Sequence, residues 1–317
     1  MMRSRNRHFK IVERVATRLK LKQLRLLVAV AENASILHAA ESLNISQPAA
    51  TKLLKDLEDD FGVQLFERSN RGAIPTKFGD ALVRHGKLIL SQISQAAQEL
   101  DDLAEGTGGR VVVGTLLAAS AHLLPAAIER LRAERPNVTV AIREGTNDVL
   151  MPALMTGDLD LVVGRLPEYR YKKDVIQEPL FEEKVCLIGR KDHPLAQNKK
   201  IKLQDLLDWS WILPPPETTM RRQVEAEFLK AELPPPADAV ESVSLLTNKK
   251  LLQNTDMISI HPYHVIADEL ERGDLITIPF EFKNVKGPVG FSHRREGSLS
   301  PAATVFVEKL REVASEL

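Results

Sequence analysis

The stretch 39-AAESLNISQPAATKLLKDLE-58 decides the fold of the first part of this chain. From residue 46 onward, apolar residues recur every third or fourth position, which is the period of an amphipathic helix. The apolar face carries Leu53, Leu54 and Leu57. The other face carries Gln47, Thr51, Lys52 and Lys55. Taken alone, the pattern fits a helix that packs on a core and equally a helix whose first turn contacts a partner.

The residues around this helix predict a helix-turn-helix. Ser35 is a suitable N-cap for a preceding helix over residues 36–43, and Ser46 is a suitable N-cap for the second helix. Pro48 lies in the first turn, where its missing N–H is harmless, and Gly62 ends the helix. A further helix is predicted over the region just before, residues 21–32.

A small β wing is predicted next, over 63-VQLFERSNRGAIPT-76. Two short apolar or extended runs flank the turn signal 70-NRG-72. Arg68 and Arg71 are expected near the tip of this wing, where a positively charged side chain can reach a partner.

A long helix, which Thr76 would cap and which extends to about residue 105, carries an apolar seam. Its members recur at steps of three or four: Phe78, Leu82, His85, Ile89, Ile93, Ala96, Leu100 and Leu103. A seam with little nearby to bury it predicts a coiled-coil-like contact with a second copy of the chain. Packing against its own domain is the alternative. The run 106-GTGG-109 is expected to end the helix and act as a hinge.

From Arg110 onward strands and helices alternate, which predicts an α/β domain with a parallel sheet. Strands are expected over residues 110–115, 138–145, 159–165, 175–180, 183–190, 210–213, 257–261, 275–279 and 286–293. Helices are expected over residues 126–135, 146–157, 218–233, 244–253 and 301–314.

The charge of the chain is zero overall but unevenly spread. Residues 1–85 hold 15 Lys and Arg against 9 Asp and Glu, a balance of +6, and the remainder has a balance of −6. A basic front predicts a polyanionic partner, with a solvated basic face as the alternative. Residues 1–18 are interpreted as a flexible basic arm rather than a signal peptide. No window approaches the roughly 18–20 apolar residues of a membrane span, so a cytoplasmic protein is expected.

The single cysteine, Cys186, excludes an intrachain disulfide and is interpreted as a buried structural thiol. A redox or effector role is the alternative. The eight histidines are scattered without ligand spacing, so neither a metal site nor a cofactor is predicted. The GxSxG, Walker, HExxH and CxxC motifs are absent, so no catalytic residue and no enzymatic activity are predicted. The rival hypotheses are an enzyme on this α/β fold and a free solute-binding protein, which would need a signal peptide.

Residues 19–105 resemble the LysR-type transcriptional regulators. The resemblance rests on the 39–58 stretch, on 62-GVQLFER-68 and on the spacing from Thr76 to Gly79. The second half resembles the effector domain of that family, a periplasmic-binding-protein-like fold of two α/β subdomains, through residues 122–165 and 190-RKDHPLA-196. Within the family, it is most similar to regulators of sugar or aromatic-acid catabolism, such as the galactose-binding-protein and protocatechuate-pathway regulators.

The resemblance implies four parts along the chain. They are a basic arm (residues 1–18), a winged helix-turn-helix (19–77), a linker helix with its hinge (78–109) and an effector-binding domain (110–317). Subdomain I is expected over about 110–166 and 267–317, and subdomain II over about 167–266.

The second helix of the helix-turn-helix is expected to place its N-terminus in the major groove of DNA. Gln47 suits adenine, and Lys52 suits guanine. Arg68, Arg71 and Thr76 suit phosphate, whereas Lys55 fits a solvated face equally well. The predicted DNA-contacting set is Ser46, Gln47, Pro48, Thr51, Lys52, Lys55, Arg68, Arg71 and Thr76. Ala50 and Lys52 depart from the larger aliphatic residue and the Arg that the family commonly carries, which bears on the operator sequence.

An effector site is expected at strand ends that face helix starts, in the cleft between the subdomains. The predicted set is Ala118, Ser120, Thr146, Asn147, Arg165, Pro215, Thr218 and His261. Hydroxyls and free N–H groups suit a carboxylate or a sugar hydroxyl, and Arg165 could clamp an anion. In the alternative interpretations Ser120 and Thr146 are plain N-caps, Arg165 pairs with Glu168, and His261 is a satisfied core residue.

The resemblance also implies a mechanism. A dimer formed through the linker helix, assembled into a homotetramer, would bind operator DNA at half-sites about 34–36 Å apart or a multiple of that distance. A sugar or an aromatic or organic acid in the cleft would change the angle between the subdomains and the bend of the DNA. RNA polymerase is a further expected partner, and no membrane partner is expected.

Overall fold

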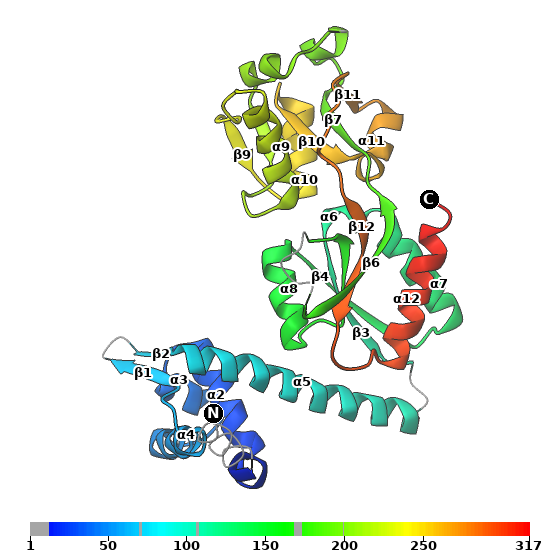
Figure 1. Ribbon diagram of the computed structural model, residues 1–317. Coiled ribbons are helices and arrows are strands. Elements are labelled where there is room, and N and C mark those ends of the chain that lie inside the picture. The colour runs from blue at the N-terminus through cyan, green and yellow to red at the C-terminus, as the bar shows by residue number, and fades with distance from the viewer. Residues whose placement is uncertain (1–12, 70–71, 106–107, 168–172, 199) are drawn as a thin grey trace, which may run out of the picture. The chain divides into compact units, whose positions relative to one another are not determined.

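The computed structural model describes residues 13–69, 72–105, 108–167, 173–198 and 200–317, without the side chains of residues 101–103 and 105. The chain divides into two compact units, Met1–Gln98 and Glu99–Leu317. The first is built mainly from helices, and the second contains two five-stranded sheets (Figure 1). No helix in the described part of the chain is long and apolar enough to cross a membrane.

Three helices form the core of the first unit: α2 (Leu21–Asn33), α3 (Ile36–Ser42) and α4 (Gln47–Phe61). The predicted caps are confirmed, because the Ser35 hydroxyl accepts from the His38 N–H and the Ser46 hydroxyl accepts from the Ala49 N–H. Gly62 ends α4 with a φ of 66°. The fully buried side chains between the helices are mainly Leu and Ala: Leu24, Leu26, Leu27, Ala39, Ala40, Ala50, Leu54 and Leu57.

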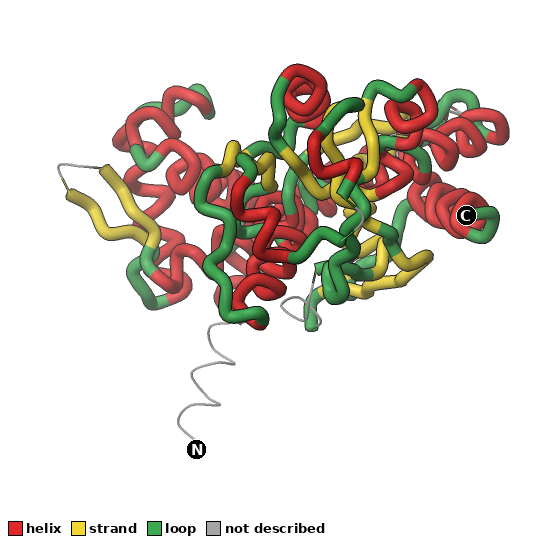
Figure 2. The backbone as a smooth tube through the Cα atoms, turned by 90° about the horizontal axis from the view of Figure 1, so that it is seen from above, coloured by secondary structure: helices red, strands yellow, loops and turns green. Residues whose placement is uncertain are grey.

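The wing consists of β1 (Phe66–Ser69) and β2 (Gly72–Pro75), which pair antiparallel and run side by side in Figure 2. Gly72 has a φ of 122°, and a Cβ on it would lie 2.3 Å from the carbonyl oxygen of Ala34. The neighbouring Ala73 N–H donates to that same oxygen at 2.9 Å. Glycine therefore lets the wing join the end of α2. Two residues of the predicted turn, Asn70 and Arg71, lie outside the described residues.

The long helix α5 (Lys77–Glu105) begins where the Thr76 hydroxyl accepts from the Gly79 N–H, as predicted. At the other end of the unit, residues 13–18 are helical, so the prediction of a flexible arm over residues 1–18 is wrong for this part. Residues 1–12 and the first half of the predicted hinge, residues 106–107, lie outside the described part.

The first sheet of the second unit has the strand order β4-β3-β5-β12-β6. Its strands are β3 (Arg110–Thr115), β4 (Thr139–Glu144), β5 (Leu161–Arg165), β6 (Val175–Glu182) and β12 (Pro288–Arg294). The helices that accompany it are α6 (Leu117–Ser120), α7 (Leu123–Glu134), α8 (Asn147–Thr156) and α12 (Pro301–Ala314). One face packs mainly on α7 and α12, through a core that includes Leu131, Phe291, Phe306 and Leu310.

The second sheet has the strand order β11-β7-β10-β8-β9. Its strands are β7 (Val185–Arg190), β8 (Trp211–Leu213), β9 (Ala239–Glu241), β10 (Ile258–Pro262) and β11 (Leu275–Thr277). The accompanying helices are α9 (Thr219–Lys230), α10 (Leu245–Asn254) and α11 (Ala267–Arg272), with 3-10 helices η1 (Pro194–Gln197), η2 (Leu203–Asp208) and η3 (Tyr263–Val265). The buried Trp211 packs edge-on against Phe228 and Phe282.

The observed topology of the two sheets differs from the expected topology in two respects. Both are mixed, because β12 pairs antiparallel with β5 and β6, and β7 pairs antiparallel with β10 and β11. The subdomain boundaries also shift. Strand β6 (residues 175–182) belongs to the first sheet, and strand β11 (residues 275–277) belongs to the second, so the chain crosses near residues 183–184 and again between residues 278 and 287. Hydrophobic pattern locates strands, whereas sheet membership depends on pairing between distant residues.

Candidate DNA-contacting helix and effector cleft

The first turn of α4 is built to be exposed. Ser46, Gln47, Pro48 and Ala49 are all exposed, whereas Ala50 is fully buried. Lys52 and Lys55 are also exposed, and Thr51 is half-buried. The N-terminus of α4 carries the positive end of the helix dipole, which favours a negatively charged partner. The structure thus presents the predicted recognition residues on one accessible edge.

Ala50 explains how α4 fits so closely to α3. It lies in one apolar core with Ala39 and Ala40, and none of the three side chains is more than 1% exposed. A small residue here permits close approach of the two helices, and a larger one would overpack the crossing. The departure at this position therefore affects how α4 packs and leaves its outer face unchanged.

Two of the predicted phosphate contacts already have partners within the unit. The Arg68 guanidinium pairs with Glu58 at 3.0 Å, and the Thr76 hydroxyl donates to the Gln64 carbonyl at 2.8 Å. Arg68 keeps a side-chain exposure of 38% and can still face solvent. Thr76 works mainly as a helix cap, because its hydroxyl proton is committed. Arg71 lies outside the described residues.

A groove of about 1040 Å³ beside α4 adds basic residues that the motif did not indicate. Arg18, Lys20, Lys22 and Arg25 line it together with the predicted Lys52. The groove also contains carboxylates, including Asp56. The positive charge balance of residues 1–85 was the sequence signal for these residues, but it could not assign them to one surface.

The cleft of the second unit has a volume of about 590 Å³. Its walls come from both sheets and from the starts of α6 and α8 on one side and of α9 and α10 on the other. Seven of the eight predicted effector residues line it: Ala118, Ser120, Thr146, Asn147, Arg165, Thr218 and His261. A cleft of this size with mixed polar and apolar walls is typical of a small-molecule site.

Several of these residues have local roles that differ from those predicted. Ser120 is the last residue of α6 and donates to the Leu117 carbonyl, so it is not an N-cap. Thr146 is the N-cap residue of α8, but its side chain makes no capping hydrogen bond. Thr218 caps α9 by accepting from the Arg221 N–H. Pro215 does not line the cleft, because its carbonyl accepts from Thr218 and closes the turn before α9; Pro214 lines the cleft instead.

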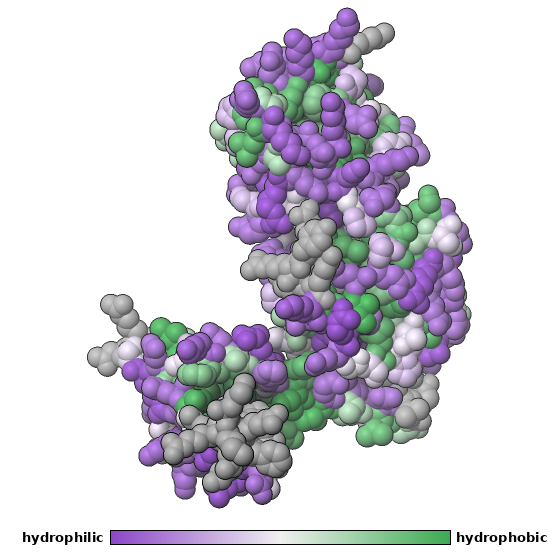
Figure 3. Space-filling view, viewed as in Figure 1, coloured by the Kyte–Doolittle hydropathy of each residue, from purple (hydrophilic) through white to green (hydrophobic). Residues whose placement is uncertain are grey.

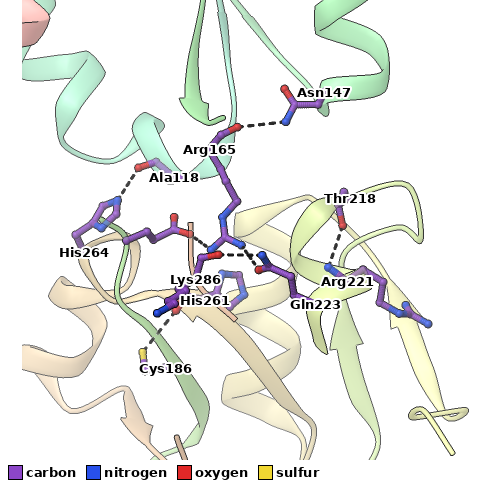
Figure 4. A network of polar contacts seen from close by, with 11 residues as sticks. Ala118, Asn147, Arg165, Cys186, Thr218, Arg221, Gln223, His261, His264 and Lys286 are labelled. Atoms are coloured by element: carbon purple, nitrogen blue, oxygen red, sulfur yellow. Dashed lines mark hydrogen bonds and ion pairs between the residues drawn. The ribbon is translucent and has the colours of Figure 1, made fainter. Parts of the chain in front are cut away.

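Arg165 is held by contacts from helix α9 and from the crossover that follows β6. Its Nη1 donates to Gln223 Oε1 at 3.0 Å, and its Nη2 pairs with the carboxylate of Glu183. Figure 4 shows the Arg165 side chain extending from β5 toward Gln223, whose amide in turn donates to the Lys286 carbonyl at 2.9 Å. Arg165 is 6% exposed and Glu183 is 4% exposed. The guanidinium thus already has a carboxylate partner, so Arg165 could clamp an anion only in exchange for Glu183; Glu168, the partner considered in the alternative interpretation, lies outside the described residues.

Gly164 is required for this placement of Arg165. Its φ is 144°, and a Cβ on it would lie 2.6 Å from the Cβ of Leu116. Only glycine lets β5 pass under the chain that leads into α6 and still direct the next side chain into the cleft.

A second contact crosses the cleft at its other side. The Nε2 atom of His264, in η3, lies 2.6 Å from the carbonyl oxygen of Ala118, in α6 (Figure 4). The described contacts between the two halves of this unit thus include the Arg165–Glu183 pair, the Arg165–Gln223 hydrogen bond and the His264–Ala118 contact, in addition to the two chain crossovers. Contacts of this kind can hold one relative angle of the subdomains and exchange for others when a ligand enters.

The cleft also holds buried polar atoms without partners among the described residues: Asn147 Oδ1, Arg165 Nε, Glu183 Oε1, Asn248 Oδ1 and His261 Nδ1. Buried polar atoms normally have hydrogen-bond partners, so these five, on residues that line one cavity, are available to a polar ligand once the side chains adjust. His261 lines the cleft, in agreement with its place in the predicted set; the alternative of a satisfied core residue holds only for its burial, because one ring nitrogen has no partner among the described residues.

Sequence reasoning missed Glu183, Gln223 and Asn248. Asn248 carried a readable signal, because it stands with Leu245 and Leu252 on the inward face of α10, where a polar residue is unusual. Glu183 and Gln223 carried no such sequence signal, since a single acidic or amide residue in a polar segment is common.

Cys186 is partly buried, and its thiol donates to the His261 carbonyl at 3.6 Å. Burial raises the pKa of this thiol to about 11. A thiol with a raised pKa is a poor nucleophile, which favours the structural interpretation over a redox role.

Comparison with known proteins agrees with both halves of this description. Residues 21–80 match the family described as "Bacterial regulatory helix-turn-helix protein, lysR family", and residues 104–315 match the "LysR substrate binding domain". The chain belongs to the LysR family of transcriptional regulators. This LysR-family regulator is therefore a DNA-binding protein with an effector-binding domain, and the prediction that it is a regulator rather than an enzyme is confirmed.

The similarity to individual relatives extends over nearly the whole chain of this LysR-family regulator. The chain is 34% identical to the HTH-type transcriptional regulator GbpR of Azospirillum brasilense over 93% of this chain and 86% of the relative. It is 33% identical to the regulator PcaQ of Agrobacterium fabrum over 96% and 97% of the two chains. Among solved structures, full-length CbnR in complex with its target DNA is similar with a TM-score of 0.65 and 25% identity, over 93% of this chain and 100% of the other.

Proposed function

We propose that this LysR-family regulator reads operator DNA through the exposed edge of α4 and that a small molecule in the cleft controls this binding. The observation that carries the proposal is the division of α4 into a face buried against α2 and α3 and an exposed N-terminal edge with Gln47, Pro48 and Lys52. Gln47 can bond adenine in two places, Lys52 can donate to guanine, and Pro48 or Thr51 can touch a thymine methyl.

Two copies are needed to read two half-sites, and α5 supplies the surface for this contact. Phe78, Ile89, Ile93 and Leu100 are between 40% and 67% exposed on this helix. Figure 3 shows hydrophobic side chains gathered over the middle of α5. Exposed apolar residues at helical spacing favour a helix–helix contact with a second copy. The assembly of two such dimers into a tetramer follows the family resemblance and forms part of the proposal, as does RNA polymerase as a partner.

The proposed switch lies in the second unit. A ligand that contacts both walls of the cleft favours one angle between the two sheets, and its differential affinity sets how far the equilibrium moves. The Arg165–Glu183 and His264–Ala118 contacts are the ones that must adjust. In a dimer held by α5, this change would alter the spacing of the two DNA-binding modules.

Variants of α4 test the DNA-reading part. Gln47→Ala and Lys52→Ala should each lose about 1–3 kcal/mol of discrimination between the operator and a scrambled duplex, because each removes one base contact. Arg68→Ala should weaken both duplexes alike, since phosphate contacts carry no sequence information. Fluorescence anisotropy with the two duplexes measures both effects.

A charge-matched control separates these effects from simple loss of positive charge. Lys230→Ala removes an exposed Lys of the second unit and should leave both affinities unchanged. If Gln47→Ala keeps its full preference for the operator, Gln47 is not a reading residue.

A further inference from the structure

One charged pair decides which ligands the cleft can accept. Among the described residues that line it, Arg165 is the only Lys or Arg. Glu183 neutralises Arg165, and Glu144 adds a second carboxylate to the lining. The described lining therefore has more negative than positive charge.

His261 does not change this balance. It is 3% exposed, and its burial lowers the pKa of the imidazole to about 4, with the nearby Lys249 acting in the same direction. The ring is neutral at physiological pH and can donate or accept one hydrogen bond through Nδ1. A carboxylate ligand would thus be desolvated without an unpaired Lys or Arg to receive it among the described lining residues, which is unfavourable.

The unpartnered atoms of the lining require donors more than acceptors. Three of them are oxygens that only accept while Glu183 is ionised: Asn147 Oδ1, Glu183 Oε1 and Asn248 Oδ1. The assignment for Asn147 follows from its other bond, because the amide nitrogen must face the carbonyl oxygen of Arg165, 3.2 Å away. Arg165 Nε can only donate, and His261 Nδ1 can do either.

A hydroxyl group both donates and accepts, whereas an ionised carboxylate only accepts. We propose that the effector of this regulator is an uncharged molecule with several hydroxyl groups, of the sugar or polyol class, and not a carboxylic acid. The proposal rests on the function proposed above. The apolar side chains of the lining, such as Leu116, Ile212 and Met220, suit the C–H faces of such a molecule.

Glu183 is the specificity-determining residue in this arrangement. It removes the free positive charge that Arg165 would otherwise offer to a carboxylate, and it keeps one oxygen available for a hydroxyl donor. A Gln side chain at this position would have nearly the same size and one hydrogen-bond acceptor, but it would leave the positive charge of Arg165 without a carboxylate partner.

The first test compares matched ligands on the full-length wild-type protein. Isothermal titration at pH 7.5 is carried out with a panel of aldoses and polyols, with the aldonic acid of each aldose, and with hydroxybenzoates. At least one neutral compound is expected to bind at least about tenfold more tightly than its acid. An acid that binds more tightly than every neutral compound would overturn the class assignment and leave a cleft-binding effector in place.

The second test uses Glu183→Gln, with Glu182→Gln as the control. Glu182 is the exposed neighbour at the end of β6 and does not line the cleft. Glu183→Gln is expected to raise the affinity for the acids relative to the neutral compounds by at least about tenfold, while Glu182→Gln leaves the ratio unchanged. An unchanged ratio in a folded Glu183→Gln protein would contradict the role of Glu183. The wild-type comparison decides the ligand class even if this variant does not fold.

The failure of the inference is distinguishable from the failure of the proposed function. If no compound of any class binds, the ligand class is wrong. The DNA-binding assays with the α4 variants contain no small molecule and are unaffected by that result.

Discussion

The imidazole of His261 stands in the cleft wall at the end of β10, where its backbone carbonyl accepts from Cys186. Its depressed pKa means that protonation is costly in the folded state and easy in the unfolded chain. The unfolded chain therefore binds more protons between the ordinary pKa of 6.5 and the folded value of about 4. This difference couples the stability of the second unit to pH.

The free energy of unfolding of the second unit should fall by about 2 kcal/mol between pH 7 and pH 5 through this residue. The stability is fully present above pH 6.5 and is lost as the pH falls toward 4. Both tryptophans, Trp209 and Trp211, lie in this unit, so urea unfolding followed by tryptophan fluorescence reports on it.

Substitutions of histidine isolate the effect. His261→Gln should reduce the dependence on pH without abolishing it, because burial also lowers the pKa of His193 and of His293. His122→Gln, at an exposed position of the same unit, should leave the dependence unchanged. An identical pH dependence in wild type and His261→Gln would show that other groups cause the loss.

At the residue scale, the sequence predicts helix caps better than it predicts contacts between side chains that are distant in the chain. Ser35, Ser46 and Thr76 cap the helices that they were predicted to begin. The pairing of Arg165 with Glu183 depends on the crossover after β6, which brings Glu183 to the cleft. No local pattern contains that information.

At the scale of elements, α5 has several large apolar side chains exposed. A helix that contacts only water would be expected to expose fewer of them. Leu82 and Val83 pack against the helix-turn-helix core, but Ile89 and Ile93 remain exposed. The side chain of Leu103, the last member of the predicted seam, is outside the described residues. One part of the apolar seam therefore packs against its own unit, and another part remains exposed as a surface for a partner.

Ile93→Glu should weaken the proposed dimer by about a hundredfold or more, because a charge replaces an apolar contact in a helix–helix seam. Sedimentation equilibrium measures the dissociation constant. Gln92→Glu introduces the same charge one position away, at another exposed residue, and should have a much smaller effect. Equal association of wild type and Ile93→Glu would assign the dimer contact to another surface.

The sequence locates most elements within a few residues, since their hydrophobic periods are clear. It misses β9 and α11, which have 3 and 6 residues and are too short to show a period. It also misses the antiparallel pairing of β12, since strand–helix alternation holds only for residues 110–165 and later strands enter the sheets from far along the chain.

At the scale of the whole molecule, the two units should respond differently to salt. The basic front of the chain implies phosphate contacts, and each neutralised phosphate contributes about −0.9 to the slope of log K against log salt concentration. If six phosphates are neutralised, the affinity for the operator should fall roughly a thousandfold between about 50 and 200 mM salt. Binding of an uncharged ligand to the cleft should change little over the same range. Parallel titrations of DNA and of the ligand measure both dependences, and a steep salt dependence of ligand binding would contradict an uncharged effector.

The place of β12 between β5 and β6 has a consequence for synthesis on the ribosome. This strand, residues 288–294, and the helix α12 that follows it emerge after every strand of the second sheet, residues 185–277. The sheet that begins first in the sequence must therefore wait, with β5 and β6 lacking their common neighbour, until β12 has been made. The later sheet can close as an insertion within it, so the order of folding in this unit is expected to reverse the order of the chain.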